Sequence, residues 1–195
     1  TLSFYANKHI TTGEGGALLT NNKKIYQKIK ELRNLSFGQK DRFNHSDLSW
    51  NYRFTNIQAA LGLSQIKRIK KIIKRKLEIG NIYYKALKNS ENIFIQPNKS
   101  EYAYNIYWVF GVLLKKKLNG KKKLIQKKLL KNKIETRPFF WPMHKQEIFK
   151  KMGLFKGEKY PVAENLSKNG FYLPSGLGLK DSQIDYTIKE LKKII

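Results

Sequence analysis

The sequence predicts an α/β fold in which a long helix connects two domains. Short runs rich in β-branched and aromatic residues alternate with amphipathic helical patterns along the chain. One helical pattern starts at the capping box Thr55-Asn56-Ile57-Gln58 and continues past Tyr84, which is long for a helix inside one globular domain. Because the patterns before and after this helix differ, we expect two domains, at residues 1–75 and 76–195.

The expected N-terminal domain begins with two strands that flank a lysine and a glycine-rich turn. A helix with apolar residues at helical spacing follows, and then a long segment without periodicity, which is typical of a functional loop. The expected order is strands at residues 2–6 and 17–20, a helix at 21–33, a loop at 36–51 and the long helix from residue 55, with a break near Gly80.

The expected C-terminal domain combines short strands with helices. Its second strand is rich in Tyr, Trp, Val and Phe, which favour strands, and its helices carry stripes of leucine and isoleucine. The expected order is strands at residues 93–95 and 105–114, a basic helix at 121–131, a strand at 134–137, an aromatic loop at 139–144, and helices at 162–168 and 181–195.

The composition limits the classes of function. The chain has 195 residues, a formal net charge of +26 and no cysteine, which excludes disulfides and thiolate zinc sites. No apolar run approaches the roughly 20 residues that span a bilayer. The lysines are spread over nearly every helical segment and no motif that reads nucleic acid is present, so we expect no specific nucleic-acid partner. A basic nucleic-acid-binding module stays open as an alternative of another class.

The first twenty residues contain a segment that suggests covalent chemistry. Lys8 has few like charges beside it and lies between two apolar runs, just before the turn Gly13-Glu14-Gly15-Gly16. Partial burial there would disfavour the charged ammonium form and favour an amine that attacks an aldehyde. Taken alone, however, these residue types favour the simpler interpretation of a β-hairpin with a glycine turn and a surface lysine.

Three parts of the sequence, taken together, resemble the DegT/StrS-type family of pyridoxal-phosphate-dependent sugar aminotransferases, which have fold type I. The first part is Ser3 to Lys8 with Thr12 to Gly16, and the second is Asn51 to Ala60. The third consists of Thr136 to His144 and Leu173 to Gly176. Order and spacing agree along the whole chain. The resemblance implies the last edge of the large cofactor domain, its long connecting helix and the small C-terminal α+β domain.

The resemblance implies roles around a pyridoxal 5'-phosphate cofactor. Lys8 would form a Schiff base with the cofactor and then transfer a proton during transamination. Ser3 would hydrogen-bond the cofactor phosphate, and Asn51 would reach the phosphate of the neighbouring subunit's cofactor, which implies a homodimer with shared active sites. Without the resemblance, the three residues would be a surface lysine, a strand serine and a loop or cap asparagine.

Three further residues are candidates for substrate binding. Arg53 and Arg137 are of the residue type that binds phosphate or carboxylate with two hydrogen bonds, although a structural role fits each equally well. His144 lies in the aromatic loop that could line a sugar pocket, although a single histidine is more often a packing residue. Glu14 is expected to brace the glycine turn and not to act in catalysis. The motif position holds Lys8 and not His9, which favours transamination over the dehydration that some family members with histidine there perform.

The activity that the resemblance implies is transfer of an amino group from glutamate to a nucleotide-linked 4-keto-6-deoxy sugar, with GDP-4-keto-6-deoxymannose as the expected substrate. The setting would be cytoplasmic synthesis of O-antigen, lipopolysaccharide or another surface polysaccharide. Family chains are about as long again on the N-terminal side, so we expect this chain to be a C-terminal part that is inactive alone. The alternatives are a related regulator, an aminotransferase of different sugar specificity, and a catalytically silent remnant.

Overall fold

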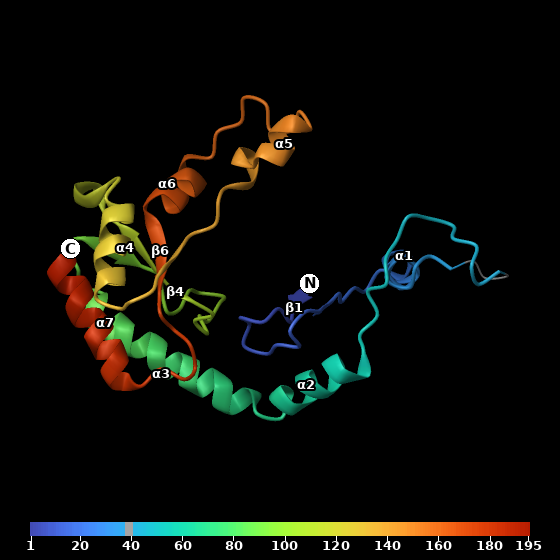
Figure 1. Cartoon of the computed structure of the whole chain (residues 1–195), viewed down its shortest axis with the longest axis horizontal. Helices are drawn as coiled ribbons and strands as arrows, with labels where there is room; N and C mark the ends of the chain where they lie inside the picture. Colours follow the sequence, from blue (N-terminus) through green and yellow to red (C-terminus); the bar gives the residue numbers. More distant parts are fainter. Residues whose placement is uncertain (38–40) are drawn as a thin grey trace. The chain divides into compact units, whose positions relative to one another are not determined.

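The computed structural model describes residues 1–37 and 41–195 (Figure 1). Part of the loop expected at residues 36–51 therefore lies outside the described residues. The chain divides into two compact units, Thr1–Ile72 (the N-terminal unit) and Ile73–Ile195 (the C-terminal unit). Helices and short strands occur in both units, as expected of a mixed α/β chain. The assignment of residues 1–75 and 76–195 to a large and a small domain stays a prediction.

The N-terminal unit is built from a strand pair and helices. Strands β1 (Leu2–Ser3) and β2 (Gly16–Ala17) pair antiparallel, with Leu2 opposite Ala17. They lie where strands are expected but are shorter, because hydrogen bonds of the intervening turn begin at Phe4. Helix α1 (Lys23–Arg33) follows, and the Asn22 side chain caps it by accepting from two backbone N–H groups.

The long helix of the sequence prediction is two helices in the structure. Helix α2 (Asn56–Ile66) ends at a turn of Lys67 and Arg68, and α3 (Ile69–Leu87) begins directly after it. The predicted break near Gly80 is wrong, because α3 continues through this residue. A Cβ atom at Gly80 would lie 2.2 Å from the ring of Tyr107, so the glycine permits close packing and does not interrupt the helix. The capping box at Thr55 is confirmed, with reciprocal hydrogen bonds of 3.0 and 3.2 Å to Gln58.

The C-terminal unit contains a four-stranded antiparallel sheet of order β3-β4-β6-β5. Its strands are β3 (Ile93–Ile95), β4 (Phe110–Leu114), β5 (Arg137–Pro138) and β6 (Gly170–Leu173). The strand expected at residues 105–114 begins only at Phe110, since Tyr107 has a positive φ of 50° that interrupts extended backbone. The strand expected at residues 134–137 is reduced to β5, and β6 was not expected as a strand.

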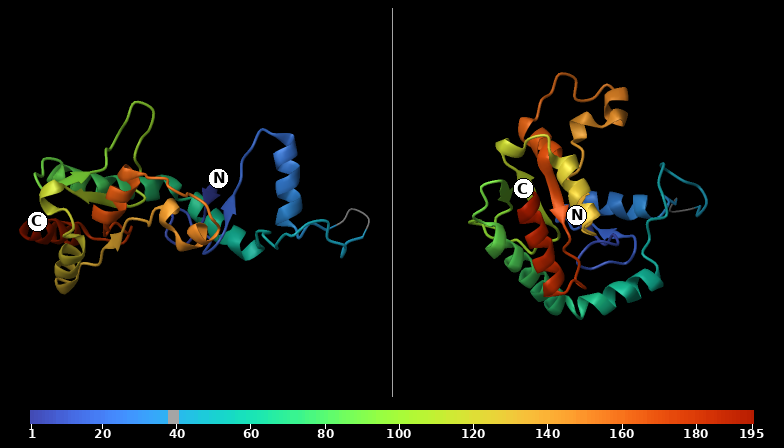
Figure 2. Two further views of the ribbon diagram at one scale, coloured as in Figure 1. Left: turned by 90° about the horizontal axis from the view of Figure 1, so that it is seen from above. Right: turned by 60° about the vertical axis from the view of Figure 1, so that its left-hand side comes forward.

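The C-terminal unit also contains helices. Besides α3 they are α4 (Lys122–Lys131), α5 (Glu147–Lys151), α6 (Pro161–Asn169) and α7 (Asp181–Ile194), with short 3-10 helices at Lys116–Leu118 and Met143–Lys145. Helices α4 and α7 lie side by side, and α6 contacts β4 and β6 (Figures 1 and 2). The helices expected at residues 121–131, 162–168 and 181–195 are thus present, and α5 was not expected. In the part of the chain that the structure describes, no helix is long and apolar enough to cross a membrane.

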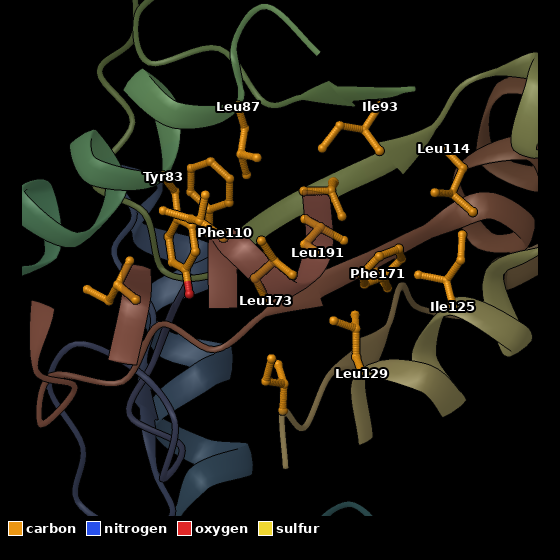
Figure 3. Close-up of a cluster of buried hydrophobic side chains, with 14 of the residues drawn as sticks. Tyr83, Leu87, Ile93, Phe110, Leu114, Ile125, Leu129, Phe171, Leu173 and Leu191 are labelled. Carbon is orange, nitrogen blue, oxygen red and sulfur yellow. The ribbon is translucent and has the colours of Figure 1, made fainter. Parts of the chain in front are cut away.

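The apolar core lies within the C-terminal unit. Side chains from the sheet and from α3, α4 and α7 meet in one cluster, including Tyr83, Phe110, Leu129, Phe171 and Leu191, each fully buried (Figure 3). Among the described residues of Thr1–Ile72, by contrast, no large apolar side chain is buried. The C-terminal unit can therefore be stabilised by its own core, whereas the described residues of the N-terminal unit form no apolar core.

Candidate active site

Lys8 lies on the turn that follows β1. The side chain is half-buried, and its backbone N–H donates to the carbonyl of Tyr5 at 3.0 Å. Two backbone hydrogen bonds of 2.9 Å close the segment, from Phe4 to the Gly15 carbonyl and from Thr12 to the Phe4 carbonyl. The amine is therefore presented from a short, hydrogen-bonded loop and not from a flexible strand end.

Helix α2 holds this loop through two glutamine side chains. Gln65 forms a pair of hydrogen bonds with the backbone of Thr11, accepting from its N–H at 3.0 Å and donating to its carbonyl at 2.7 Å. Gln58 donates to the carbonyl of Glu14 at 3.1 Å. The helix thus fixes both sides of the turn that follows Lys8, with contacts that span more than forty residues of sequence.

The glycine turn needs glycine for two different reasons. Gly13 and Gly15 have positive φ angles of 79° and 137°, which other residues rarely adopt. A Cβ atom at Gly15 would also lie 2.6 Å from the Phe54 ring. The carbonyl of Glu14 accepts from the Thr12 hydroxyl at 2.7 Å, so Glu14 contributes its backbone to the turn.

Ser3 ends strand β1 with an exposed side chain. Its hydroxyl oxygen accepts from the backbone N–H of Tyr5 at 3.3 Å. A hydroxyl that accepts one hydrogen bond can still donate its own proton, which is the contact that a phosphate oxygen requires. Ser3 lies directly before the loop that carries Lys8 and that Gln58 and Gln65 hold.

The structure also brings Asn51 and Arg53 together. Asn51 pairs with Asn34 across an isolated antiparallel bridge, and its side-chain oxygen accepts from the backbone N–H of Arg53 at 3.4 Å. The Arg53 guanidinium donates to the side-chain oxygen of Asn34. Both predicted residues are exposed. They form a polar cluster between the end of α1 and the start of α2.

Arg137 and His144 belong to the C-terminal unit. Arg137, in β5, is exposed and forms an ion pair of 2.9 Å with Glu135. His144 is buried, and its Nε2 lies 3.0 Å from an oxygen of Glu164, while its ring packs on Tyr160. The substrate-binding roles of Arg53, Arg137 and His144 stay predictions, and the contacts of His144 are those of a residue that braces the aromatic loop.

Glu164 connects two residues of that loop. Its second carboxylate oxygen accepts from Lys145 at 2.5 Å. The hydrogen bonds from Lys145 and then from His144 lower the pKa of Glu164 to about 2. The carboxylate is therefore ionised at neutral pH and fastens the loop at residues 142–145 to helix α6.

Comparison with known proteins identifies the family. The model of the DegT/DnrJ/EryC1/StrS aminotransferase family matches residues 1–192. The chain belongs to this family. It is 34% identical over 194 residues to GDP-perosamine synthase of Escherichia coli O157:H7, and 34% identical over 185 residues to GDP-perosamine synthase of Vibrio cholerae. These alignments cover 99% and 94% of the chain but 50% and 49% of the relatives, so the chain spans about half the length of the curated relatives it matches.

A solved structure supports the same conclusion. Helicobacter pylori PseC, an aminotransferase involved in the biosynthesis of pseudoaminic acid, is similar to the chain with a TM-score of 0.86 and 26% sequence identity. The similarity covers 98% of this chain and 51% of PseC. The predicted resemblance to sugar aminotransferases and the predicted fold are therefore confirmed.

Membership of this aminotransferase family implies pyridoxal phosphate, and the residues near Lys8 fit that group. An aldehyde cofactor needs a primary amine held in place, which Lys8 on its fixed loop supplies. A phosphate needs hydrogen-bond donors, and the Ser3 hydroxyl is one. Among the described residues no cluster of His, Cys, Asp or Glu is suited to a metal ion.

The positioning roles of Gln58 and Gln65 were not predicted from the sequence. Gln58 and Gln65 are seven positions apart in α2 and therefore share one face of the helix, a signal that the sequence does contain. Glu164 carried no comparable signal, because its partners Lys145 and His144 are nineteen and twenty residues away in sequence.

Proposed function

We propose that this chain is the Lys8-bearing part of a pyridoxal-phosphate-dependent aminotransferase that acts on a nucleotide-linked 4-keto-6-deoxy sugar. The observation that carries the proposal is the half-buried residue Lys8 on a loop held by α2, in a chain similar to two GDP-perosamine synthases over nearly its whole length. The preferred substrate is GDP-4-keto-6-deoxymannose, the product GDP-perosamine and the amino donor glutamate.

The residues of this chain would act in binding and in proton transfer. Pyridoxal phosphate, when bound, withdraws electrons from the carbon that exchanges its proton. Lys8 would hold the cofactor and move that proton, Ser3 would donate a hydrogen bond to its phosphate, and Asn51 would do so to the phosphate in the neighbouring subunit. The amino group passes from glutamate to the keto carbon of the sugar, so that glutamate becomes a 2-oxo acid and the keto sugar becomes an amino sugar.

We further propose that a second polypeptide segment completes the cofactor domain. Large apolar side chains of the N-terminal unit are exposed, among them Leu19 at 78%, Ile57 at 77% and Leu63 at 56%. Exposed apolar surface on this scale favours association with another surface. About half of the relative's length has no counterpart in this chain, and that half is long enough to form such a segment. The isolated chain is then expected to be inactive.

The remaining features of the proposal follow from the family. Asn51 would serve the cofactor of a neighbouring subunit, which requires a homodimer with shared active sites. The proposed setting is the cytoplasm, and the amino sugar would enter O-antigen, lipopolysaccharide or another surface polysaccharide.

Titration with pyridoxal phosphate tests the proposal. The chain, with and without the N-terminal half of an Escherichia coli GDP-perosamine synthase, is titrated and its visible absorption recorded. We expect a new band that Lys8→Ala abolishes and that Lys24→Ala, an exposed control lysine in α1, preserves. A band of equal strength in Lys8→Ala, or none under either condition, would contradict the proposal.

The charge of +26 favours one other candidate, a basic nucleic-acid-binding module. Such a protein would bind DNA with an affinity that falls steeply as salt increases. An aminotransferase of different sugar specificity would show the Lys8-dependent band but prefer another nucleotide sugar, and a silent remnant would show the band without turnover.

A further inference from the structure

One face of the sheet in the C-terminal unit carries aromatic side chains that do not belong to the apolar core. Side chains alternate along β4, where Phe110 and Val112 are buried in the core and Gly111, between them, faces the other side. Tyr172 of β6 is opposite Gly111 and therefore lies on the same outer face. Trp108, Phe139, Phe140 and Tyr172 form what we call the aromatic platform.

Ring contacts hold the platform together. Phe139 lies 4.9 Å from Tyr172, and Phe140 lies 6.3 Å from Tyr172 in an edge-on arrangement. Trp108 and Phe140 are 6.4 Å apart with their planes inclined by 25°. All three separations are between ring centroids and within the range of aromatic pairs. The rings therefore form one connected surface.

Two glycines allow the Phe139 ring to lie close to the sheet backbone. A Cβ atom at Gly170 would lie 2.4 Å from the Phe139 ring, and one at Gly111 would lie 2.9 Å from it. The backbone N–H of Phe139 donates to the Gly170 carbonyl at 3.2 Å, which fixes the start of the aromatic loop on β6. Any side chain at either glycine would push Phe139 outward, so both glycines allow Phe139 to pack closely on the sheet.

The platform is open to a ligand and has a cation on the same face. Phe140 is 71% exposed, so a ligand can reach its ring. Arg137 is opposite Tyr172 in the β5–β6 ladder and so shares its face. Both side chains of the Arg137–Glu135 ion pair are exposed, and exposed ion pairs are weak. The guanidinium can therefore exchange the carboxylate for a phosphate.

We propose that the aromatic platform binds the base of a nucleoside diphosphate by stacking, with Arg137 on the diphosphate. The assignment rests on the proposed function, since it names the part of the chain that recognises the nucleotide of the sugar substrate. The exposed ring of Phe140 can stack on the planar base, and one guanidinium on a chain of charge +26 complements the anionic diphosphate. A platform fixed by ring contacts and by the β-ladder loses little freedom on binding, which favours a small ligand.

Calorimetric titration of the chain with GDP and with pyrophosphate tests this assignment. Phe140→Leu keeps an apolar side chain but removes the ring, and Tyr102→Ala removes a ring that is 93% exposed and outside the platform. Stacking on one aromatic ring contributes a factor of roughly five to a hundred in affinity. We therefore expect Phe140→Leu to weaken GDP binding by at least about fivefold without changing pyrophosphate binding. Tyr102→Ala should change neither, and Arg137→Ala should weaken both.

Three results would overturn the assignment. The first is GDP binding that is equal in Phe140→Leu and Tyr102→Ala, and the second is no GDP binding at millimolar concentration. The third is tighter, Phe140-dependent binding of a ten-nucleotide single-stranded RNA than of GDP, because several successive bases would then stack on a nucleic-acid surface. The Lys8 absorption test involves none of these side chains. A failure of the platform therefore leaves the aminotransferase proposal standing, and a failure at Lys8 does not remove GDP binding.

Discussion

Lys76 offers a quantitative test of the C-terminal unit. This residue of α3 is 6% exposed, and its amine donates to the carbonyls of Ser175 at 2.6 Å and Trp108 at 3.0 Å. It thus joins the segment that follows β6 to the segment that precedes β4. Burial lowers the pKa of Lys76 from 10.5 to about 8.

The direction in which stability changes with pH follows from the protons that Lys76 binds in the folded and unfolded states. Between pH 8 and pH 10.5 the unfolded state binds more protons at this residue than the folded state, so the free energy of unfolding rises with pH. The charged amine therefore costs the folded state about 3 kcal/mol at pH 7, at ~1.4 kcal/mol for each tenfold change in proton affinity. Roughly 2 kcal/mol of this cost should disappear between pH 7 and pH 9.5.

Urea unfolding of the chain and of Lys76→Met, monitored by near-ultraviolet circular dichroism at pH 7, 8, 9 and 9.5, measures this difference. Methionine has a similar length and cannot be charged, and every other ionisable side chain is present in both proteins. We expect the wild type to gain about 2 kcal/mol relative to the variant over this range. Parallel pH profiles of the two proteins would refute the argument that burial governs the ionisation of Lys76.

Three further predictions concern the same unit. Leu129→Ala should lower the free energy of unfolding by about 2–5 kcal/mol, because this fully buried side chain leaves a cavity, whereas Leu130→Ala, at an exposed position next to it, should change it by less than about 0.5 kcal/mol. Urea titration of both variants makes the comparison, and equal losses would contradict the packing described here. Gly80→Ala should lower the free energy of unfolding by about 1–3 kcal/mol despite the better helix propensity of alanine, because the new Cβ atom would lie 2.2 Å from the buried ring of Tyr107. A melting temperature at or above that of the wild type would count against this prediction. Hydrogen bonds from a lysine and a histidine hold the pKa of Glu164 at about 2, below its usual 4.5, so the stability that they contribute is present above pH 4.5 and is lost as the pH falls through 2. Glu164→Gln should therefore be less stable than the wild type at pH 7 and nearly equal to it at pH 2, and a gap that stays constant between these pH values in thermal melts would exclude the ion-pair explanation.

Periodicity and capping predicted most helices, because both are local. The Asn22 cap, the Thr55 capping box and the leucine stripe of α4 are all recorded within a few residues of sequence. The interruption at Lys67 and Arg68 was missed, since both are good helix formers and the apolar pattern continues across them. Gly80 misled the prediction, because its partner Tyr107 is far away in sequence.

The short strands and the contacts at the candidate site were harder to predict from the sequence. Strand β6 is four residues long, and its pairing with β4 depends on a partner about sixty positions earlier. At the candidate site, the resemblance predicted roles for Lys8, Ser3 and Asn51. The spacing of Gln58 and Gln65 puts them on one helix face, but it did not indicate that Gln65 holds the backbone of Thr11, fifty-four residues earlier. Residues with a predicted chemical role are thus easier to find in this sequence than the residues that position them.

The location of the core determines what a calorimeter can report about this protein. The heat-capacity change of unfolding measures the apolar surface that melting exposes, at about 12–15 cal/mol/K per residue of a fully folded domain. Since the buried apolar side chains of the described residues all lie in Ile73–Ile195, the chain should show roughly two-thirds of the heat-capacity change that its length predicts. Substitutions around Lys8 would leave this transition unchanged. A normal melting curve would therefore show only that the C-terminal unit is folded. Changes in the structure around Lys8 have to be measured by another method, such as the absorption titration with pyridoxal phosphate.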